Sequence, residues 1–121
     1  MKILIVDDHA AVRERLTCLL RAITKHSVIT AAASVAEALQ QLRMDCPDLV
    51  ILDLFLPDGS GLDVLKVIKQ EKWQTRVFIV TNHSEPQFRK RCLLEGAELF
   101  FDKSEEYEDM IDSILAVYAN C

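Results

Sequence analysis

Five short apolar runs, each followed by a segment with helical spacing, constrain the fold of this chain more than any other feature. The runs are KILIV (2–6), VITAA (28–32), DLVILD (48–53), RVFIVT (76–81) and ELFF (98–101). Continuous apolar runs of this length are typical of strands that are buried on both faces of a parallel sheet. We therefore predict five strands, with the weaker run VITAA at an edge of the sheet.

The segments between the runs carry apolar residues at the spacing of amphipathic helices. Helices are expected over 10–24, over 35–43, from Leu62 through Ile68, from Ser84 to Gly96 and from Ser104 through Tyr118. Ser34 with Glu37 has the spacing of a capping box. Ser104 and the two glutamates that follow it are expected to cap the last helix. LPDGSG (56–61) has the composition of a turn.

Strand and helix alternate five times, and this alternation defines the fold class. It gives a doubly wound α/β fold with right-handed crossovers and helices on both faces of the sheet. At 121 residues, the best fit is a flavodoxin-like (βα)5 parallel sheet with strand order 2-1-3-4-5. The length suits one domain, so a single domain is expected over 1–121. Ligands of such folds bind beyond the carboxyl ends of strands 1 and 3, where the strand order reverses.

The composition argues against several functions. A formal net charge of -5 disfavours nucleic-acid binding by this chain alone, because the phosphate backbone attracts basic surfaces. No apolar run reaches membrane-spanning length and no signal-peptide pattern opens the chain, so we expect a cytoplasmic protein that binds no membrane. Four scattered cysteines without CxxC spacing predict free thiols rather than disulfides or a zinc site.

Polar side chains follow four of the predicted strands. Asp7 and Asp8 end the first strand and Asp53 ends the third, so the three carboxylates should meet at one edge of the sheet. A hard divalent cation, Mg²⁺ or Mn²⁺, would relieve their mutual repulsion. Thr81 ends the fourth strand and Lys103 follows the fifth. Together these groups predict a site for a phosphoryl group, whose negative charge the metal and the lysine would balance.

Simpler interpretations exist for each residue taken alone. Asp7 and Asp8 could be a solvated pair at a helix N-terminus. Thr81 could be an ordinary strand residue, and Lys103 could be a surface lysine. The convergence of all of them with Asp53 disfavours these interpretations. His9 is expected to be an exposed residue at a helix start, because oxygen ligands suit a hard cation better than imidazole. His83 is expected at the surface, where it could lean over the pocket.

The motifs that carry these residues closely resemble the receiver domain of bacterial two-component response regulators. They are ILIVDDH, DLVILDLFLPDGSGLDVL, FIVTNHS and GAELFFDKS, and the resemblance covers essentially the whole chain. DDHAAVRERL and the KS after the last strand are most similar to receivers attached to a helix-turn-helix DNA-binding domain. The resemblance implies one receiver domain over 1–121, with no output domain in this chain.

The resemblance also implies roles for the acidic residues. Asp53 would be the phosphoacceptor, a carboxylate nucleophile charged by a sensor histidine kinase or a phosphotransfer protein. Asp8, Asp53 and the backbone carbonyl of Phe55 would bind Mg²⁺ directly, with Mn²⁺ as an alternative. Asp7 would act on the metal through water. The family signals rather than catalyses turnover, so no enzymatic activity is expected.

The remaining roles concern the phosphoryl group and the switch. Thr81 and Lys103 would hold the phosphoryl oxygens, and Thr81 with Phe100 would switch the surface of the fourth helix, fifth strand and fifth helix to regulate transcription. Three positions depart from the usual pattern. Phe100 lacks the hydroxyl of a tyrosine, Asn82 stands where a small residue is usual, and Ser104 stands where a proline is common. None removes a chemical group that the site needs.

Charge is uneven on the last two predicted helices. Arg89, Lys90 and Arg91 make the fourth helix basic, whereas the fifth carries acidic residues and neither Lys nor Arg. Solvated faces would account for this pattern. The alternative is an interaction surface for an output domain or a second copy of the chain, with the opposite charges meeting in a two-fold dimer.

Three other functions remain open at the sequence level. A stand-alone receiver would act as a phosphate relay or adaptor. A metal-dependent phosphohydrolase of the haloacid-dehalogenase type would use Asp53 as its nucleophile, but it needs a second aspartate two residues on, where Phe55 stands. A flavodoxin-like cofactor binder would need Ser, Thr and Gly in the first loop to bind the phosphate of its cofactor. The acidic sequence DDH in that loop would repel the phosphate instead.

Overall fold

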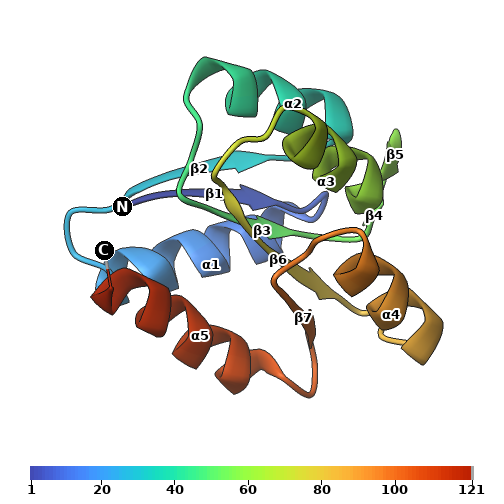
Figure 1. The fold of residues 1–121 in the computed structure, drawn as a ribbon. Helices are drawn as coiled ribbons and strands as arrows, with labels where there is room; N and C mark the ends of the chain where they lie inside the picture. Colours follow the sequence, from blue (N-terminus) through green and yellow to red (C-terminus); the bar gives the residue numbers. More distant parts are fainter. Residues whose placement is uncertain (121) are drawn as a thin grey trace.

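The computed structural model describes residues 1–120, and these form one parallel sheet with five helices (Figure 1). The sheet strands are β1 (Lys2–Val6), β2 (Val28–Ala32), β3 (Leu49–Leu52), β6 (Arg76–Thr81) and β7 (Leu99–Asp102). The helices are α1 (Ala10–Ile23), α2 (Val35–Met44), α3 (Gly61–Gln70), α4 (Pro86–Leu94) and α5 (Tyr107–Ala119). A short antiparallel pair, β4 (Phe55–Leu56) and β5 (Gly59–Ser60), follows β3.

The strand order confirms the predicted fold class. The sheet runs β2-β1-β3-β6-β7, which is the order 2-1-3-4-5 when the five sheet strands are counted along the chain. All neighbouring strands are parallel, so their carboxyl ends lie along one edge. The predicted weaker strand, β2, lies at an outer edge of the sheet, and β1 and β3 pair directly at the point where the order reverses.

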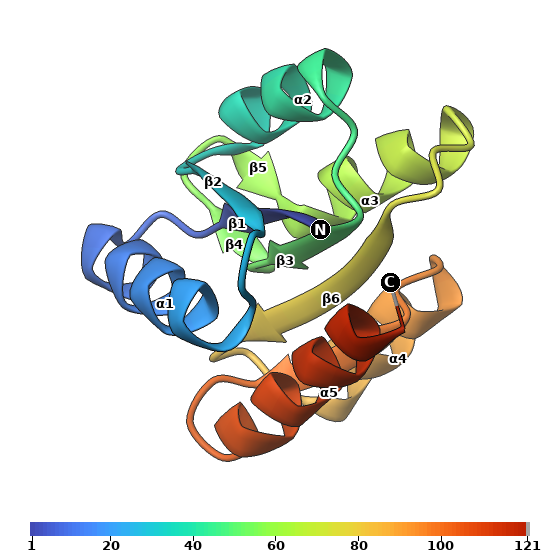
Figure 2. The same ribbon diagram turned by 90° about the vertical axis from the view of Figure 1, so that its left-hand side faces the viewer.

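Helices cover both faces of the sheet (Figure 2). Successive strand residues face opposite sides of the sheet and build two cores. On one side, Val50, Leu52 and Phe100 pack with α2, α3 and α4. On the other side, Ile51 and Phe101 pack with α1 and α5. Burial on both faces is the physical reason for the continuous apolar runs in the sequence. Packing on both faces fixes the positions of the strand ends. It therefore also fixes the positions of the polar residues that follow them.

Helix α2 starts at Val35 as predicted, and its cap has one partner that the sequence did not predict. At α2, Ser34 accepts a hydrogen bond from the backbone N–H of Glu37, as predicted. Asp58, from the β4–β5 turn, also accepts from the N–H groups of Val35 and Ala36, at 2.7 and 3.0 Å. These two bonds hold the pKa of Asp58 below its usual value. A side chain 23 residues away in the sequence therefore completes the cap of α2.

The expected cap of α5 is wrong, and α4 begins at Pro86, two residues after the predicted Ser84. The N-cap residues are Glu85 and Glu106, and neither makes a side-chain capping bond. The N–H groups of Ser104 and Glu105 donate instead to the carboxylate of Asp102, at 2.8 and 2.9 Å, and this turn delays the start of α5 until Tyr107. A capping box does form at α3, where Ser60 accepts from Leu62 and donates its own N–H to Asp63.

Two further findings concern the chain as a whole. Among residues 1–120, no helix combines the length and apolar character needed to cross a membrane. Cys18, Cys46 and Cys92 are free thiols, as predicted, while Cys121 lies outside the described residues. Burial raises the pKa of the Cys92 thiol to about 11, so this residue packs in the core as a small apolar side chain.

Candidate functional site

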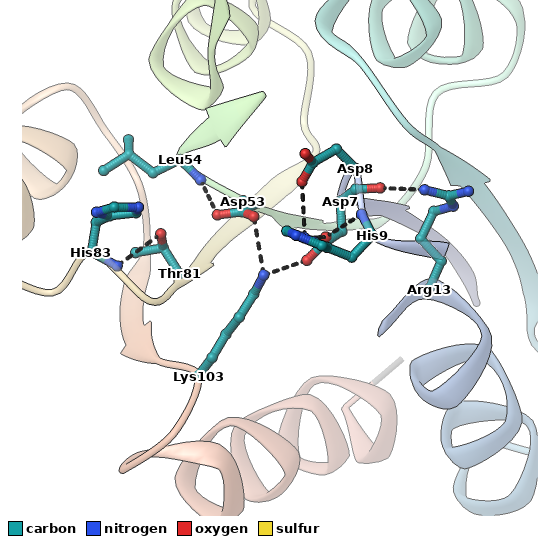
Figure 3. Close-up of polar contacts among 9 residues, drawn as sticks. All are labelled: Asp7, Asp8, His9, Arg13, Asp53, Leu54, Thr81, His83 and Lys103. Carbon is teal, nitrogen blue, oxygen red and sulfur yellow. Dashed lines mark hydrogen bonds and ion pairs between the residues drawn. The ribbon is translucent and has the colours of Figure 1, made fainter. Parts of the chain in front are cut away.

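The polar residues predicted at the strand ends lie together at the carboxyl edge of the sheet (Figure 3). Asp7 and Asp8 follow β1, Asp53 follows β3, Thr81 is the last residue of β6, and Lys103 follows β7. The backbone N–H of Asp53 bonds to the carbonyl of Val6 and that of Lys103 to the carbonyl of Thr81, at 2.9 and 3.0 Å. These bonds extend the parallel ladders by one residue and bring the side chains to one place.

Lys103 joins the two most buried acids. Its ammonium forms an ion pair with Asp7 and lies 3.0 Å from a carboxylate oxygen of Asp53. The side chains of Asp7 and Asp53 are only 3% and 8% exposed, and that of Lys103 is 14% exposed. Burial lowers the pKa of Lys103, but the two carboxylates outweigh burial and raise it above its ordinary value. The lysine is therefore a cation at neutral pH and neutralises part of the acidic pocket.

The Asp53 carboxylate is held in a fixed orientation. One oxygen accepts from the backbone N–H of Leu54 at 2.7 Å, and the other faces Lys103. Gly61, the first residue of α3, lies against the Asp53 carbonyl so closely that a Cβ atom there would collide with it. Glycine is thus required at the start of α3, because it lets that helix approach the end of β3.

Asp7 and Asp8 differ in their surroundings. The second oxygen of Asp7 accepts from the backbone N–H of His9 at 2.9 Å, and Arg13 of α1 donates to the Asp7 carbonyl at 2.8 Å. The Asp8 side chain is 33% exposed. Asp7 is therefore committed to contacts within the protein, whereas Asp8 can reach a ligand from solvent.

His9 is an exposed residue at the start of α1, as predicted, but its contacts with the two acids that precede it were not predicted. Its ring Nδ1 lies 3.2 Å from Asp7 and 3.1 Å from Asp8. One ligand atom from each of Asp7, Asp8, His9 and Asp53 falls within a group whose members are all within 4.8 Å of one another. Three of these four are carboxylate oxygens, the donor type that Mg²⁺ and Mn²⁺ prefer. The donor set therefore fits the predicted hard cation.

Three aromatic rings pack together near the strand ends. The Phe55 ring contacts the rings of His83 and Phe88 edge-on, with centroids 4.2 and 5.6 Å apart. His83 also donates its backbone N–H to the hydroxyl of Thr81, which is fully buried. His83 is exposed in the β6–α4 loop, as predicted, and its ring lies against Phe55. Asn82 is exposed in the same loop.

Phe100 lies on the α4 side of the sheet, away from the acidic cluster. Its side chain is buried among the core residues that include Cys92 of α4. The guanidinium of Arg89 lies over its ring, 4.9 Å from the centroid. Phe100 is therefore a core residue in this structure, covered by α4, and its predicted switch role stays a prediction.

The fold and this cluster define a class of protein: a doubly wound α/β domain with an acidic pocket, bridged by a lysine, at the carboxyl edge of its sheet. The sequence matches the response regulator receiver domain over residues 3–115. The chain belongs to the response regulator receiver domain family, and this confirms the resemblance inferred from its motifs.

Named relatives and a solved structure agree with this assignment. The chain is 33% identical to the oxygen regulatory protein NreC of Staphylococcus carnosus, over 98% of this chain and 55% of that protein. It is 34% identical to the DNA-binding transcriptional activator DevR/DosR of Mycobacterium tuberculosis, over 80% of this chain and 45% of that protein. The structure of a LuxR-family two-component response regulator from Aurantimonas sp. SI85-9A1 superposes with a TM-score of 0.88 at 31% identity, covering 98% of this chain and 85% of that one. The chain spans about half the length of NreC and DevR/DosR.

Proposed function

We propose that Asp53 accepts a phosphoryl group from a sensor histidine kinase or a phosphotransfer protein. The observation that carries the proposal is the buried Asp53 carboxylate, oriented by Leu54 and paired with Lys103 inside an acidic cluster. An oxygen of Asp53 forms the new bond to phosphorus. The bond between phosphorus and the donor nitrogen breaks, and the imidazole nitrogen of the donor histidine keeps the electron pair.

A divalent cation, Mg²⁺ or alternatively Mn²⁺, would bind to Asp8, Asp53 and the backbone carbonyl of Phe55, with Asp7 acting through water. When bound, the ion neutralises negative charge on the transferring phosphoryl group. The greater exposure of Asp8 supports its assignment as a direct ligand, and the commitment of Asp7 to Lys103 and His9 supports its indirect role.

Lys103 and Thr81 would hold the oxygens of the phosphoryl group. The ammonium of Lys103 already lies 3.0 Å from Asp53, so a small displacement brings it to a new oxygen on the same side chain. The Thr81 hydroxyl accepts from His83 and has its own hydrogen available to donate. Both side chains start at the carboxyl edge of the sheet beside Asp53, so only short movements are needed to bring them to the phosphoryl oxygens, and this supports their proposed roles.

Phosphorylation would then switch the surface formed by α4, β7 and α5. We infer that Thr81 moves toward the phosphoryl group and that Phe100 moves into the space behind it. Because α4 covers the Phe100 ring through Arg89, a movement of this ring displaces α4 as well. The switched surface would contact an output domain that regulates transcription, or a second copy of the chain. A stand-alone phosphate relay in the cytoplasm is the second candidate.

Labelling with a small phosphodonor tests the phosphoacceptor assignment. With acetyl phosphate and Mg²⁺, the intact protein should gain one phosphoryl mass, and the Asp53→Asn variant should gain none. Asp8→Ala should slow the gain and weaken Mg²⁺ binding measured by calorimetry. Asp63→Asn, which changes a carboxylate at the start of α3 outside the acidic cluster, is the matched control and should label like the wild type. Labelling of Asp53→Asn at the wild-type rate would refute the assignment.

A further inference from the structure

Arg89 of α4 makes three contacts with β7 and with the turn that follows it. Its guanidinium lies over the Phe100 ring, donates to the Phe100 carbonyl at 3.0 Å and forms an ion pair with the carboxylate of Glu106. Its neighbour in the sequence, Arg91, pairs with Glu95 within α4. Among the basic residues of α4, all of which lie in the described part of the chain, Arg89 is thus the one for which the structure gives a hydrogen bond and an ion pair outside the helix.

Glu106 passes this connection into a compact turn. The carboxylate oxygen that pairs with Arg89 also accepts from the backbone N–H of Asp102 at 3.0 Å, and the N–H of Glu106 bonds to the Asp102 carbonyl at 3.0 Å. The Asp102 carboxylate in turn accepts from Ser104 and Glu105. Residues 102–106 are therefore tied together at both ends, and Arg89 anchors the turn to α4.

Lys103 is the remaining residue of this turn. Its backbone N–H bonds to Thr81 of β6, and its ammonium reaches Asp7 and Asp53. The position and direction of the Lys103 side chain consequently depend on the contacts that fix the 102–106 turn. Arg89 holds the turn from α4 through Glu106.

We propose that Arg89 is a positioning residue, which acts through Glu106 and the 102–106 turn to place the Lys103 ammonium against Asp53. The inference rests on the proposed phosphoacceptor function of Asp53. It makes α4 more than a part of the output surface, because a partner that displaces Arg89 from Glu106 alters the phosphoryl-binding lysine. By linkage, a phosphoryl group that draws Lys103 away from its present place also weakens the hold on α4.

The chemistry of arginine suits this role. The planar guanidinium stacks on an aromatic ring with its face while its N–H groups donate in the plane to two different acceptors. Lysine has a single ammonium and cannot make the same three contacts at once. The two pairing side chains are 38% and 30% exposed, so the ion pair alone contributes little, and the geometry of the combined contacts is the important feature.

Four variants test the proposal: Arg89→Met, Glu106→Gln, the double variant and the control Arg91→Met. With acetyl phosphate and Mg²⁺, Arg89→Met and Glu106→Gln should each label about fivefold to tenfold more slowly, because a small misplacement of a charge-stabilising group has a large effect on rate. The double variant should be no slower than either single one, since both break the same connection. Arg91→Met should label at the wild-type rate.

A second readout follows Lys103 directly, without labelling. The NMR signal of its ammonium, assigned by its loss in Lys103→Met, should shift in Arg89→Met and stay in place in Arg91→Met. An unchanged signal in Arg89→Met, or additive effects of the Arg89 and Glu106 changes on the rate, would overturn the proposal. Failure of the wild type to label would overturn the phosphoacceptor function instead, and the ammonium signal would still decide whether Arg89 positions Lys103.

Discussion

Replacing Lys103 with methionine should destabilise the folded protein strongly in the absence of metal. The side chain of Asp7 is 3% exposed and that of Asp53 is 8% exposed. Methionine keeps most of the apolar volume of the lysine stem but removes the only ammonium that the structure, over residues 1–120, gives as a partner of both acids. Leaving a buried charge without its partner costs about 3–5 kcal/mol. Because the Asp8 side chain is 33% exposed, water reaches the pocket. We therefore expect a loss of stability at the lower end of this range, about 3 kcal/mol.

Urea denaturation measures this loss. With a slope of about 2 kcal/mol/M for a domain of this size, a loss of about 3 kcal/mol lowers the midpoint by about 1.5 M urea. The folded state should still form, since a domain of this size is stabilised by about 5–15 kcal/mol. Lys66→Met, which removes an exposed lysine from α3, is the matched control and should change the free energy of unfolding by less than about 0.5 kcal/mol.

Magnesium should restore part of the lost stability. The ion supplies positive charge to the same carboxylates, and in the wild type the Lys103 ammonium competes with it. Mg²⁺ should therefore raise the free energy of unfolding of Lys103→Met more than that of the wild type; the gain in the variant is up to about 2.7 kcal/mol at a concentration 100 times the Kd. Equal Mg²⁺ shifts in both proteins, or a midpoint of Lys103→Met equal to that of Lys66→Met, would refute the proposed balance of charge in the pocket.

Two further predictions concern the cap of α2 and the output surface. Because the pKa of Asp58 is lowered by the N–H groups of Val35 and Ala36, Asp58→Asn should be less stable than the wild type above about pH 4, the unfolded-state value; the difference, followed by urea denaturation, should vanish as the pH falls through the lowered folded-state pKa. A difference that persists at pH 2 would contradict this cap. Phosphorylation, or beryllofluoride in its place, should increase self-association in sedimentation, and Thr81→Ala should accept phosphate but lose most of that gain. Equal association of Thr81→Ala and wild type would exclude coupling through Thr81.

The sheet and the acidic pocket were predictable because their signals are local in the sequence. Each strand that is buried on both faces is a continuous apolar run in the sequence. The polar residues of the site stand at or directly after the ends of these runs. Once the strand order is 2-1-3-4-5, the places of Asp7, Asp53 and Lys103 follow from the parallel ladders. The contacts of these side chains with one another then need only the geometry of neighbouring strands.

The helix caps and the anchor of the 102–106 turn were not predictable, because their partners come from distant segments. Asp58 caps α2 from the β4–β5 turn, and no spacing rule within a helix reveals it. Asp102 accepts hydrogen bonds from the N–H groups of Ser104 and Glu105, so a turn forms where Ser104 was expected to cap the helix. The sequence alone indicates that Arg89 is part of a basic helix face. Its ion pair with Glu106 depends on the packing of α4 against β7, which the sequence does not show.

A crystal structure with Mg²⁺ and beryllofluoride tests the central claim most directly. We expect beryllofluoride bonded to an Asp53 oxygen, with Lys103 and Thr81 contacting its fluorine atoms. The Mg²⁺ ion should contact Asp8, Asp53 and the carbonyl of Phe55. Beryllofluoride bound to another carboxylate, or an Asp53 that still pairs with Lys103 as it does here while both additives are bound elsewhere, would contradict the assignment of this pocket as the phosphoacceptor site.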